Sequence, residues 1–319
     1  MLLDLPDWSL RHNYFHHSNP RSKDRAKNIY EKVHVRPKLN AAWKVIKTPG
    51  SSDAERDLAY ETIETLSANR SSANMEAGRA VQYSCDLHLV PDEFGTTLSL
   101  NEAVHMGVKM MREYEPKNTS ADARELDTNK RDKYAEELPA TIENAVLGLK
   151  EAMARDNRIL GEIELIKQIP GCAVPHNTRP DYGRRGDLKT KWCRVNEKSK
   201  HGWSPGALPR SLTGMFDMNN VFQAAGFWAL NGHLPPFLVY ANSSDYRVFD
   251  AENTPELRDD FLADVVNEIT LYHKTTENIL RAANTKEELL GLVSPDWNAI
   301  YWKEPPAYLA EAKRVWGIN

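Results

Sequence analysis

Residues 179–192 read RPDYGRRGDLKTKW, and this stretch decides the fold that the sequence predicts. After the glycine that precedes Asp187, polar and apolar residues alternate, which predicts a β-strand over residues 186–195. Side chains two positions apart in a strand point to the same face, so Asp187, Lys189 and Lys191 project together. The strand therefore places an acid and its neighbouring bases side by side.

A second carboxylate, Asp181, precedes this strand by a short connection. The prolines and glycines around it predict a short strand or turn over residues 179–182. We expect the Asp181 and Asp187 carboxylates to meet there around a shared ion. Two carboxylates and water are what a hard divalent cation such as Mg²⁺ or Mn²⁺ prefers.

Such a site suits phosphodiester hydrolysis. A metal held by carboxylates can make water nucleophilic, stabilise the charged transition state and assist the leaving alkoxide. Lys189 would add positive charge beside the metal, and would orient or help deprotonate the attacking water. The alternative is an ordinary surface strand with a salt-bridged face, because D-x-K alone is a two-residue pattern.

The sequence predicts helices before residues 179–192. Strands and further helices are expected around this stretch and after it, an order that suggests an α/β core. Apolar periodicity and capping signals predict the helices, and alternation between turn signals predicts the strands. The expected helices cover residues 53–67, 73–89, 100–114, 138–154 (after a polar connection), 219–231 and 256–283. The further expected strands cover residues 158–169 and two halves of the segment 236–250, joined at 243–245.

Composition limits the other possibilities. The chain has a formal net charge of -4, so contact with nucleic acid would need a local basic patch. Its three cysteines, Cys85, Cys172 and Cys193, are too few for a four-cysteine iron–sulfur cluster, and no phosphate-binding GxxxxGK[ST] loop is present. No stretch has the pattern of a signal peptide or a membrane span, so we expect a reducing cytoplasm.

A second motif follows the first. Residues 221–232 read VFQAAGFWALNG, in which Gln223 begins a QxxxY-like pattern that ends in Phe227 instead of tyrosine. Pro-Asp ahead of a glycine, then Asp-x-Lys-Thr, then this helix, resembles the RecB-like branch of the PD-(D/E)XK nucleases. Within that branch the chain is most similar to phage exonucleases and the mitochondrial genome-maintenance exonuclease.

The resemblance implies a restriction-endonuclease-like α/β core, in which a mixed central β-sheet is flanked by helices. It covers the middle of the chain. The expected division is a helical N-terminal extension over residues 1–70, a nuclease core over residues 71–285 and a C-terminal tail over residues 286–319.

The resemblance also implies roles for individual residues. Asp181, Asp187, Lys189 and Gln223 would be catalytic, with Asp181 and Asp187 as metal ligands. The family has a G-x-x-x-H signature on a helix, and here Gln82 stands where its histidine ligand is expected. Glutamine offers only a carbonyl oxygen, so a third acidic ligand is sought. Glu164 is the first choice, and Asp86 and Glu162 are alternatives.

Bases outnumber acids around the D-x-K strand, although the whole chain is acidic. Such a local patch can neutralise phosphates, and an aromatic ring within it can stack on bases. The residues expected to contact DNA are Arg184, Arg185, Lys191, Trp192 and Arg194.

We therefore expect a Mg²⁺- or Mn²⁺-dependent DNA exonuclease that acts on single strands or duplex ends. The resemblance implies a phage-encoded enzyme of the host cytoplasm, acting in recombination, replication or degradation, with a phage single-strand annealing or binding protein as a partner and no membrane association. The family includes ring-shaped and monomeric members. Two alternatives remain: a structure-specific or nicking endonuclease on the same core, and a catalytically silent nucleic-acid-binding protein.

Overall fold

The protein is a mixed α/β structure of two compact units. A computed structural model describes residues 5, 24–67, 72–116, 121–154, 160–195, 202–299, 302 and 304–318. Unit 1 comprises residues 1–70, 167–177 and 267–319, and unit 2 comprises residues 71–166 and 178–266. Unit 2 carries the D-x-K stretch.

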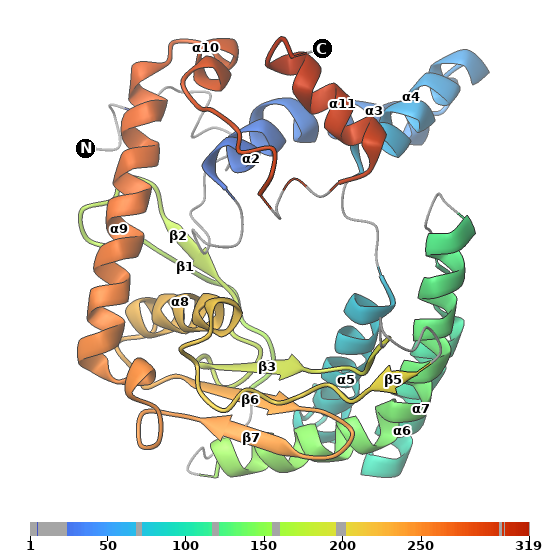
Figure 1. The fold of residues 1–319 in the computed structure, drawn as a ribbon, viewed down its shortest axis with the longest axis vertical. Helices are drawn as coiled ribbons and strands as arrows, with labels where there is room; N and C mark the ends of the chain where they lie inside the picture. The colour runs from blue at the N-terminus through green and yellow to red at the C-terminus, as the bar shows by residue number, and fades with distance from the viewer. Residues whose placement is uncertain are drawn as a thin grey trace. The chain divides into compact units, whose positions relative to one another are not determined.

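Unit 2 is built on a three-stranded sheet in the order β3-β6-β7 (Figure 1). Strand β3 (Gly186–Thr190) runs parallel to β6 (Phe237–Ala241), and β7 (Tyr246–Phe249) is antiparallel to β6. All five residues of β6 are buried, as expected for the central strand of a covered sheet.

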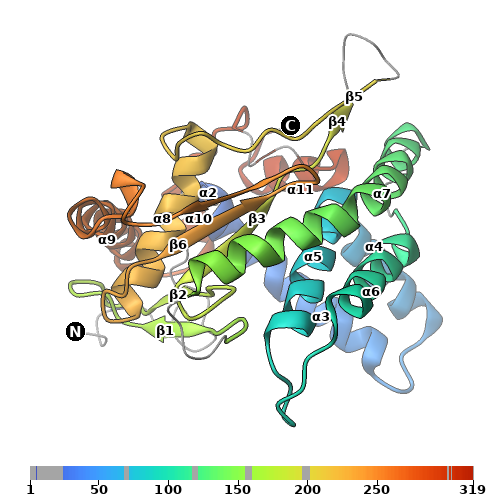
Figure 2. The same ribbon diagram turned by 90° about the horizontal axis from the view of Figure 1, so that it is seen from below.

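Helices cover both faces of this sheet. Val239 of β6 lies against Gly148 of α7 (Ala121–Ala152), whose missing side chain makes room for it. The next residue, Tyr240, is hydrogen-bonded to α8 (Met215–Leu230). Because successive residues of a strand point to opposite faces, α7 and α8 lie on opposite sides of the sheet (Figure 2). Helices α5 (Ala73–Leu89) and α6 (Leu100–Glu113) pack with α7 and complete the core on that side.

The helices expected over residues 53–67, 73–89 and 100–114 are confirmed, as α4 (Asp53–Leu66), α5 and α6. The expected helix over residues 138–154 begins much earlier, because the charged segment before it continues as the exposed start of α7. Pro139 lies inside that helix instead of ending it.

The strands are shorter than expected. The strand predicted over residues 186–195 divides into β3 and β4 (Arg194–Val195), and β4 turns away to pair with β5 (Trp203–Ser204). The first expected strand is reduced to β1 (Leu165–Lys167), and residues 158 and 159 at its start lie outside the described residues. The predicted strand or turn over residues 179–182, after β2 (His176–Thr178), is an irregular segment that ends in a single bridge between Tyr182 and Gly186, and the turn follows it at residues 183–185. Helix α8 begins four residues before its predicted start at 219.

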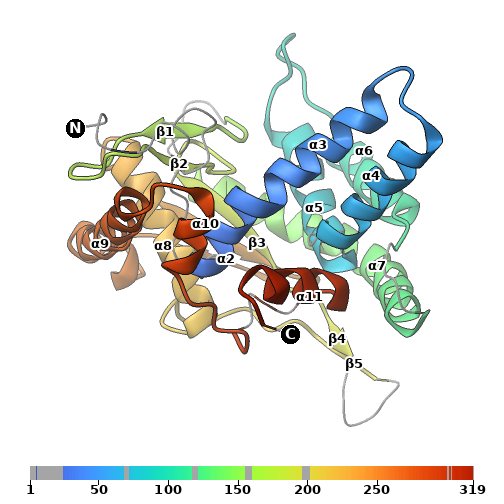
Figure 3. The same ribbon diagram turned by 90° about the horizontal axis from the view of Figure 1, so that it is seen from above.

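Unit 1 is mainly helical. Helix α2 (Arg25–Tyr30) continues through a π-helical turn (Glu31–Val35) into α3 (Arg36–Lys47), and α3 and α4 lie side by side (Figure 3). Helices α10 (Lys286–Gly291) and α11 (Pro306–Val315) belong to the same unit. Aromatic rings form its core, where Tyr30 meets Trp302, Tyr308 and Trp316.

The units do not follow the chain in sequence order. A 3₁₀ turn (Pro255–Leu257) leads into α9 (Asp259–Ala282), whose first residues belong to unit 2 and whose remainder belongs to unit 1. The expected boundary after residue 70 is also a boundary between units, whereas residues 267–285 belong to unit 1 together with the first and last parts of the chain.

Gly186, the first residue of β3, allows a close approach to β6. A Cβ atom there would lie 2.0 Å from Cζ of the buried Phe237 ring. We expect Gly186→Ala to lower the free energy of unfolding by about 1–3 kcal/mol, because the ring cannot move without repacking the core. Chemical denaturation measures this, with Gly291→Ala as the control, since nothing lies within 4 Å of a Cβ there. Equal effects of the two substitutions would contradict the proposed packing.

Candidate active site

The turn before β3 determines where Asp181 lies. Gly183 and Arg184 both adopt positive φ angles, 57° and 64°. This tight turn is closed by the Tyr182 carbonyl, which accepts from the amides of Arg185 and Gly186. Because the turn reverses the chain, β3 runs back past Asp181, and the Leu188 amide donates to Asp181 Oδ2 at 3.0 Å. The side chain thus takes the place of a neighbouring strand at this edge of the sheet.

Asp187, Lys189 and Gln223 form one connected group on the α8 face of the sheet. The Lys189 ammonium forms an ion pair with Asp187 Oδ2 and donates to Gln223 Oε1 at 3.1 Å. Gln223 Nε2 donates to Asp187 Oδ1 at 3.3 Å. The amide of Gln223 therefore links both charged groups, and the two-residue spacing of β3 places them on one face as the sequence predicts.

Asp187 lies close enough to Asp181 for its charge to affect the protonation of Asp181. Burial and, next, the negative charge of Asp187 raise the pKa of Asp181 to about 8, against the opposing effects of the Leu188 amide and Lys189. Burial lowers the pKa of Lys189, but the charge of Asp187 and its hydrogen bond more than offset this, so that pKa lies above its ordinary value. Near neutral pH, Asp181 therefore holds a proton and Lys189 remains a cation.

This pair of carboxylates fits a divalent cation. An acid that keeps its proton because another carboxylate is beside it would release that proton to a bound cation. Among the described residues no group of three or more His, Cys, Asp or Glu side chains is placed to hold a metal. Asp181 and Asp187 would thus be the acidic ligands, and water with a substrate phosphate would complete the shell, as Mg²⁺ commonly binds.

Gln82 joins the site from helix α5. Its Nε2 donates to Asp181 Oδ1 at 3.4 Å, and turning the amide would present the oxygen instead. Asp86, one turn further along α5, faces Tyr182: burial raises the pKa of Asp86 to about 6, although the hydrogen bond from Tyr182 lowers it. The structure brings Gln82, but not Glu164, to the Asp181 carboxylate.

Glu164 is engaged elsewhere. Its Oε1 accepts from Arg179 at 2.9 Å, and Glu162 lies 3.8 Å from the same guanidinium. Both glutamates are exposed, with 41% and 49% of their side-chain surfaces open to solvent. The expectation that Glu164 is the third acidic ligand is therefore corrected: Arg179 neutralises it at the surface.

A polar row on α8 continues from Gln223 and was not expected from the sequence. The hydroxyl of Tyr240 receives a hydrogen bond from Asn220 at 2.6 Å and donates to Asp217 Oδ1 at 3.2 Å. Asp217 also lies 3.6 Å from the ammonium of Lys191. The residues 217, 220 and 223 are spaced three apart, so they share one face of a mainly apolar helix. That spacing is the signal that could have identified the row.

The residues expected to contact DNA differ in their availability. Arg184 and Arg194 are exposed. Arg185 donates to the Pro235 carbonyl at 3.0 Å and lies over the Phe237 ring, and Lys191 is half-buried over the Tyr240 ring.

Trp192 is a core residue. Only 6% of its surface is exposed, its ring packs on Tyr134, and its Nε1 donates to Thr190 Oγ1. The expectation that Trp192 stacks on bases is corrected, because its ring faces are already covered. Phe227 is fully buried as well, which is consistent with packing in place of the tyrosine of the QxxxY pattern.

Comparison with known proteins identifies no relative of this chain. No protein-family model, curated protein or solved structure matches this chain. In the part of the chain that the structure describes, no helix is both long and apolar enough to cross a membrane.

Proposed function

We propose that this protein is a metal-dependent DNA exonuclease with a restriction-endonuclease-like core of the PD-(D/E)XK type. The observation that carries the proposal is the convergence of Asp181, Asp187, Lys189 and Gln223. The first three residues come from β3 and the segment just before it, and Gln223 comes from a helix 34 positions after Lys189, yet all four form one hydrogen-bonded and charge-coupled group. An ordinary salt-bridged strand surface would not need a buried acid that holds a proton.

The sheet supports the same core. Strand β3 carries D-x-K-T, helix α8 carries Gln223, and the parallel strand β6 comes after α8 in the chain. Helix α8 packs beside the face of β3 that carries Asp187 and Lys189. Helix α5 lies on the other side, where Gly78 approaches Thr190 Oγ1 and Gln82 reaches round to Asp181. This is the arrangement expected for a mixed sheet flanked by helices.

Each residue has a definite task in hydrolysis. Asp181 and Asp187 would hold a divalent cation, which when bound would supply Lewis-acid stabilisation and a water of lowered pKa. Lys189, kept protonated by Asp187, stabilises the negative charge that develops on the phosphate and orients water by donating to it. Gln223 holds the ammonium and the Asp187 carboxylate in fixed relative positions. The exposed Arg184 and Arg194 provide positive charge for the flanking phosphates.

The proposal is tested with end-labelled linear DNA, single- and double-stranded, and with closed circular DNA of the same sequence, in the presence of Mn²⁺. We expect release of nucleotides or short products from linear DNA and no change in the circle. Nicking of the circle would favour the endonuclease instead. Binding of DNA without any cleavage would favour the catalytically silent protein.

Gln223→Ala is expected to lower kcat by about 10–100-fold and to change KM little, because Gln223 positions the charged groups and does not hold the substrate. Gln223→Glu is the sharper variant. It can still accept from Lys189, but it cannot donate to Asp187 and adds a like charge beside it. Steady-state kinetics on linear DNA measure both variants, with Asn101→Ala, at an exposed position on α6, as the control. An unchanged kcat for both variants would remove Gln223 from the site.

A further inference from the structure

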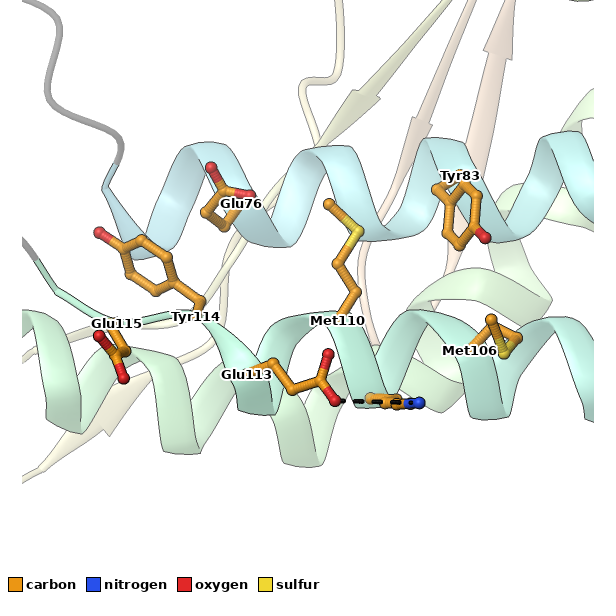
Figure 4. Close-up of a pocket in the computed structure, with 8 residues that line it drawn as sticks. Glu76, Tyr83, Met106, Met110, Glu113, Tyr114 and Glu115 are labelled. Atoms are coloured by element: carbon orange, nitrogen blue, oxygen red, sulfur yellow. Dashed lines mark ion pairs between the residues drawn. The ribbon is translucent and has the colours of Figure 1, made fainter.

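Unit 2 has an open cavity of about 610 Å³ between helices α5 and α6, on residues that the candidate active site does not use. Figure 4 shows Tyr83 and Glu76 on α5 facing Met106 and Met110 on α6. The end of α6 closes it. The complete lining is Glu76, Tyr83, Met106, Lys109, Met110, Glu113, Tyr114 and Glu115.

The two helices pack closely on their buried side. At Gly107 of α6, a Cβ atom would lie 2.2 Å from Ser84 Oγ and 3.0 Å from the Ala80 carbonyl of α5. Tyr83, which lines the groove, remains 40% exposed.

The floor of the groove is apolar and adaptable. Met106 and Met110 are one helical turn apart, and unbranched thioether side chains fit varied apolar partners. The Tyr114 hydroxyl is already used, because it donates to the buried Asp127 at 2.9 Å. Tyr114 therefore offers its ring edge and not a polar group. A ligand here would be recognised mainly by apolar contact along about two turns of helix.

The rim of the groove is acidic. It carries three carboxylates, Glu76, Glu113 and Glu115, and one ammonium group, Lys109. Lys109 lies 3.9 Å from Glu113, and Glu76 pairs with Arg79 at 2.7 Å. Glu113 nonetheless keeps 66% of its side-chain surface exposed. Among the lining side chains, three carboxylates against one ammonium leave an excess of two negative charges, which favours a cationic ligand.

We propose that the groove between α5 and α6 binds a basic amphipathic helix of a partner protein. Apolar side chains of that helix, spaced three or four apart, contact Tyr83, Met106 and Met110. Its Lys or Arg side chains face Glu113 and Glu115. This site is separate from the proposed nuclease chemistry, so it brings another protein to the enzyme without covering Lys189.

The test selects peptides of roughly 15 residues, about four helical turns, from a displayed random library against the full-length chain. We expect the enriched peptides to carry Lys or Arg together with Leu, Phe or Met at helical spacing, and to bind with micromolar Kd in fluorescence anisotropy. No enrichment, or enrichment of acidic peptides, overturns the proposal.

Two pairs of variants locate the binding. Glu113→Lys with Glu115→Lys reverses the exposed rim, and Met106→Ser with Met110→Ser alters the floor. Each double variant is expected to raise the Kd of the selected peptide by about tenfold or more. The rim variant changes exposed positions only, so it stays informative if the floor variant loses stability.

The matched controls are Glu143→Lys and Leu147→Ser on α7, which are exposed and outside the lining. They are expected to leave the Kd unchanged, and an equal loss in the controls overturns the assignment to this groove. Sedimentation of the wild type tests whether a second copy of this chain occupies the groove instead. A dimer that dissociates in the rim variant would mean that the groove binds a second copy of this chain, which also overturns the proposal.

Discussion

Lys189→Ala is expected to lower the rate of metal-dependent nucleotide release by about a thousandfold or more, with little change in DNA affinity. The ammonium is partly buried and bound to Asp187 and Gln223, so no other base in the described part of the site can take its position. Its charge acts on the transition state, which is why the loss should fall on kcat. End-labelled DNA with Mn²⁺ measures the rate, and gel shift in Ca²⁺ measures the affinity.

The control for this substitution is Lys191→Ala. Lys191 lies on the same face of the chain two residues later, but it pairs with Asp217 and not with the carboxylate pair. We expect a change of less than about tenfold, mainly in KM. Lys189→Arg is expected to stay nearly inactive, since a guanidinium cannot fill the position of a compact ammonium. Similar rates for the alanine variants at 189 and 191 would refute a special role for Lys189.

Asp181→Asn is expected to abolish cleavage and, at the same time, to stabilise the metal-free protein above neutral pH. The pKa of Asp181 is about 8 in the folded protein, well above its ordinary value of 3.8. Between those values the unfolded chain has lost the proton and the folded chain retains it. The free energy of unfolding of the wild type therefore falls as the pH rises from about 4 to about 8, by a few kcal/mol, and is level above that.

Asparagine resembles the protonated acid. It can accept from the Leu188 amide and donate to Asp187 without a charge, so the variant should lose this part of the pH dependence. Urea denaturation in the presence of a chelator, at several pH values, compares the two proteins. Added Mn²⁺ should stabilise the wild type and not the variant. Parallel pH profiles would show that Asp181 is not the group that holds the proton.

Local signals made much of the fold predictable. The capping boxes Ser52–Glu55 and Ser99–Glu102 mark the starts of α4 and α6. The alternation around Asp187 and Lys189 predicts both the strand and the shared face, because that geometry depends only on neighbouring residues. The approach of Asp181 to Asp187 also follows from a connection of a few residues.

Long-range packing determined what the sequence could not predict. Whether Trp192 meets solvent or the Tyr134 ring depends on α7, which is far away in sequence. The sequence alone makes Glu164 a reasonable ligand, but in the structure it forms an ion pair with Arg179. The grouping of residues 267–319 with the first part of the chain depends on a second hydrophobic core that no local pattern reveals.

Strand β3 lies at one end of the three-stranded sheet, and Asp181 satisfies the Leu188 amide on its outer side. An uncovered strand edge is a template on which other chains can pair and aggregate. The carboxylate that we assign to metal binding therefore also protects the chain from association through this edge. Replacing Asp181 by a residue without an acceptor is therefore expected to leave the Leu188 amide open to pairing with another chain, as well as to remove a metal ligand.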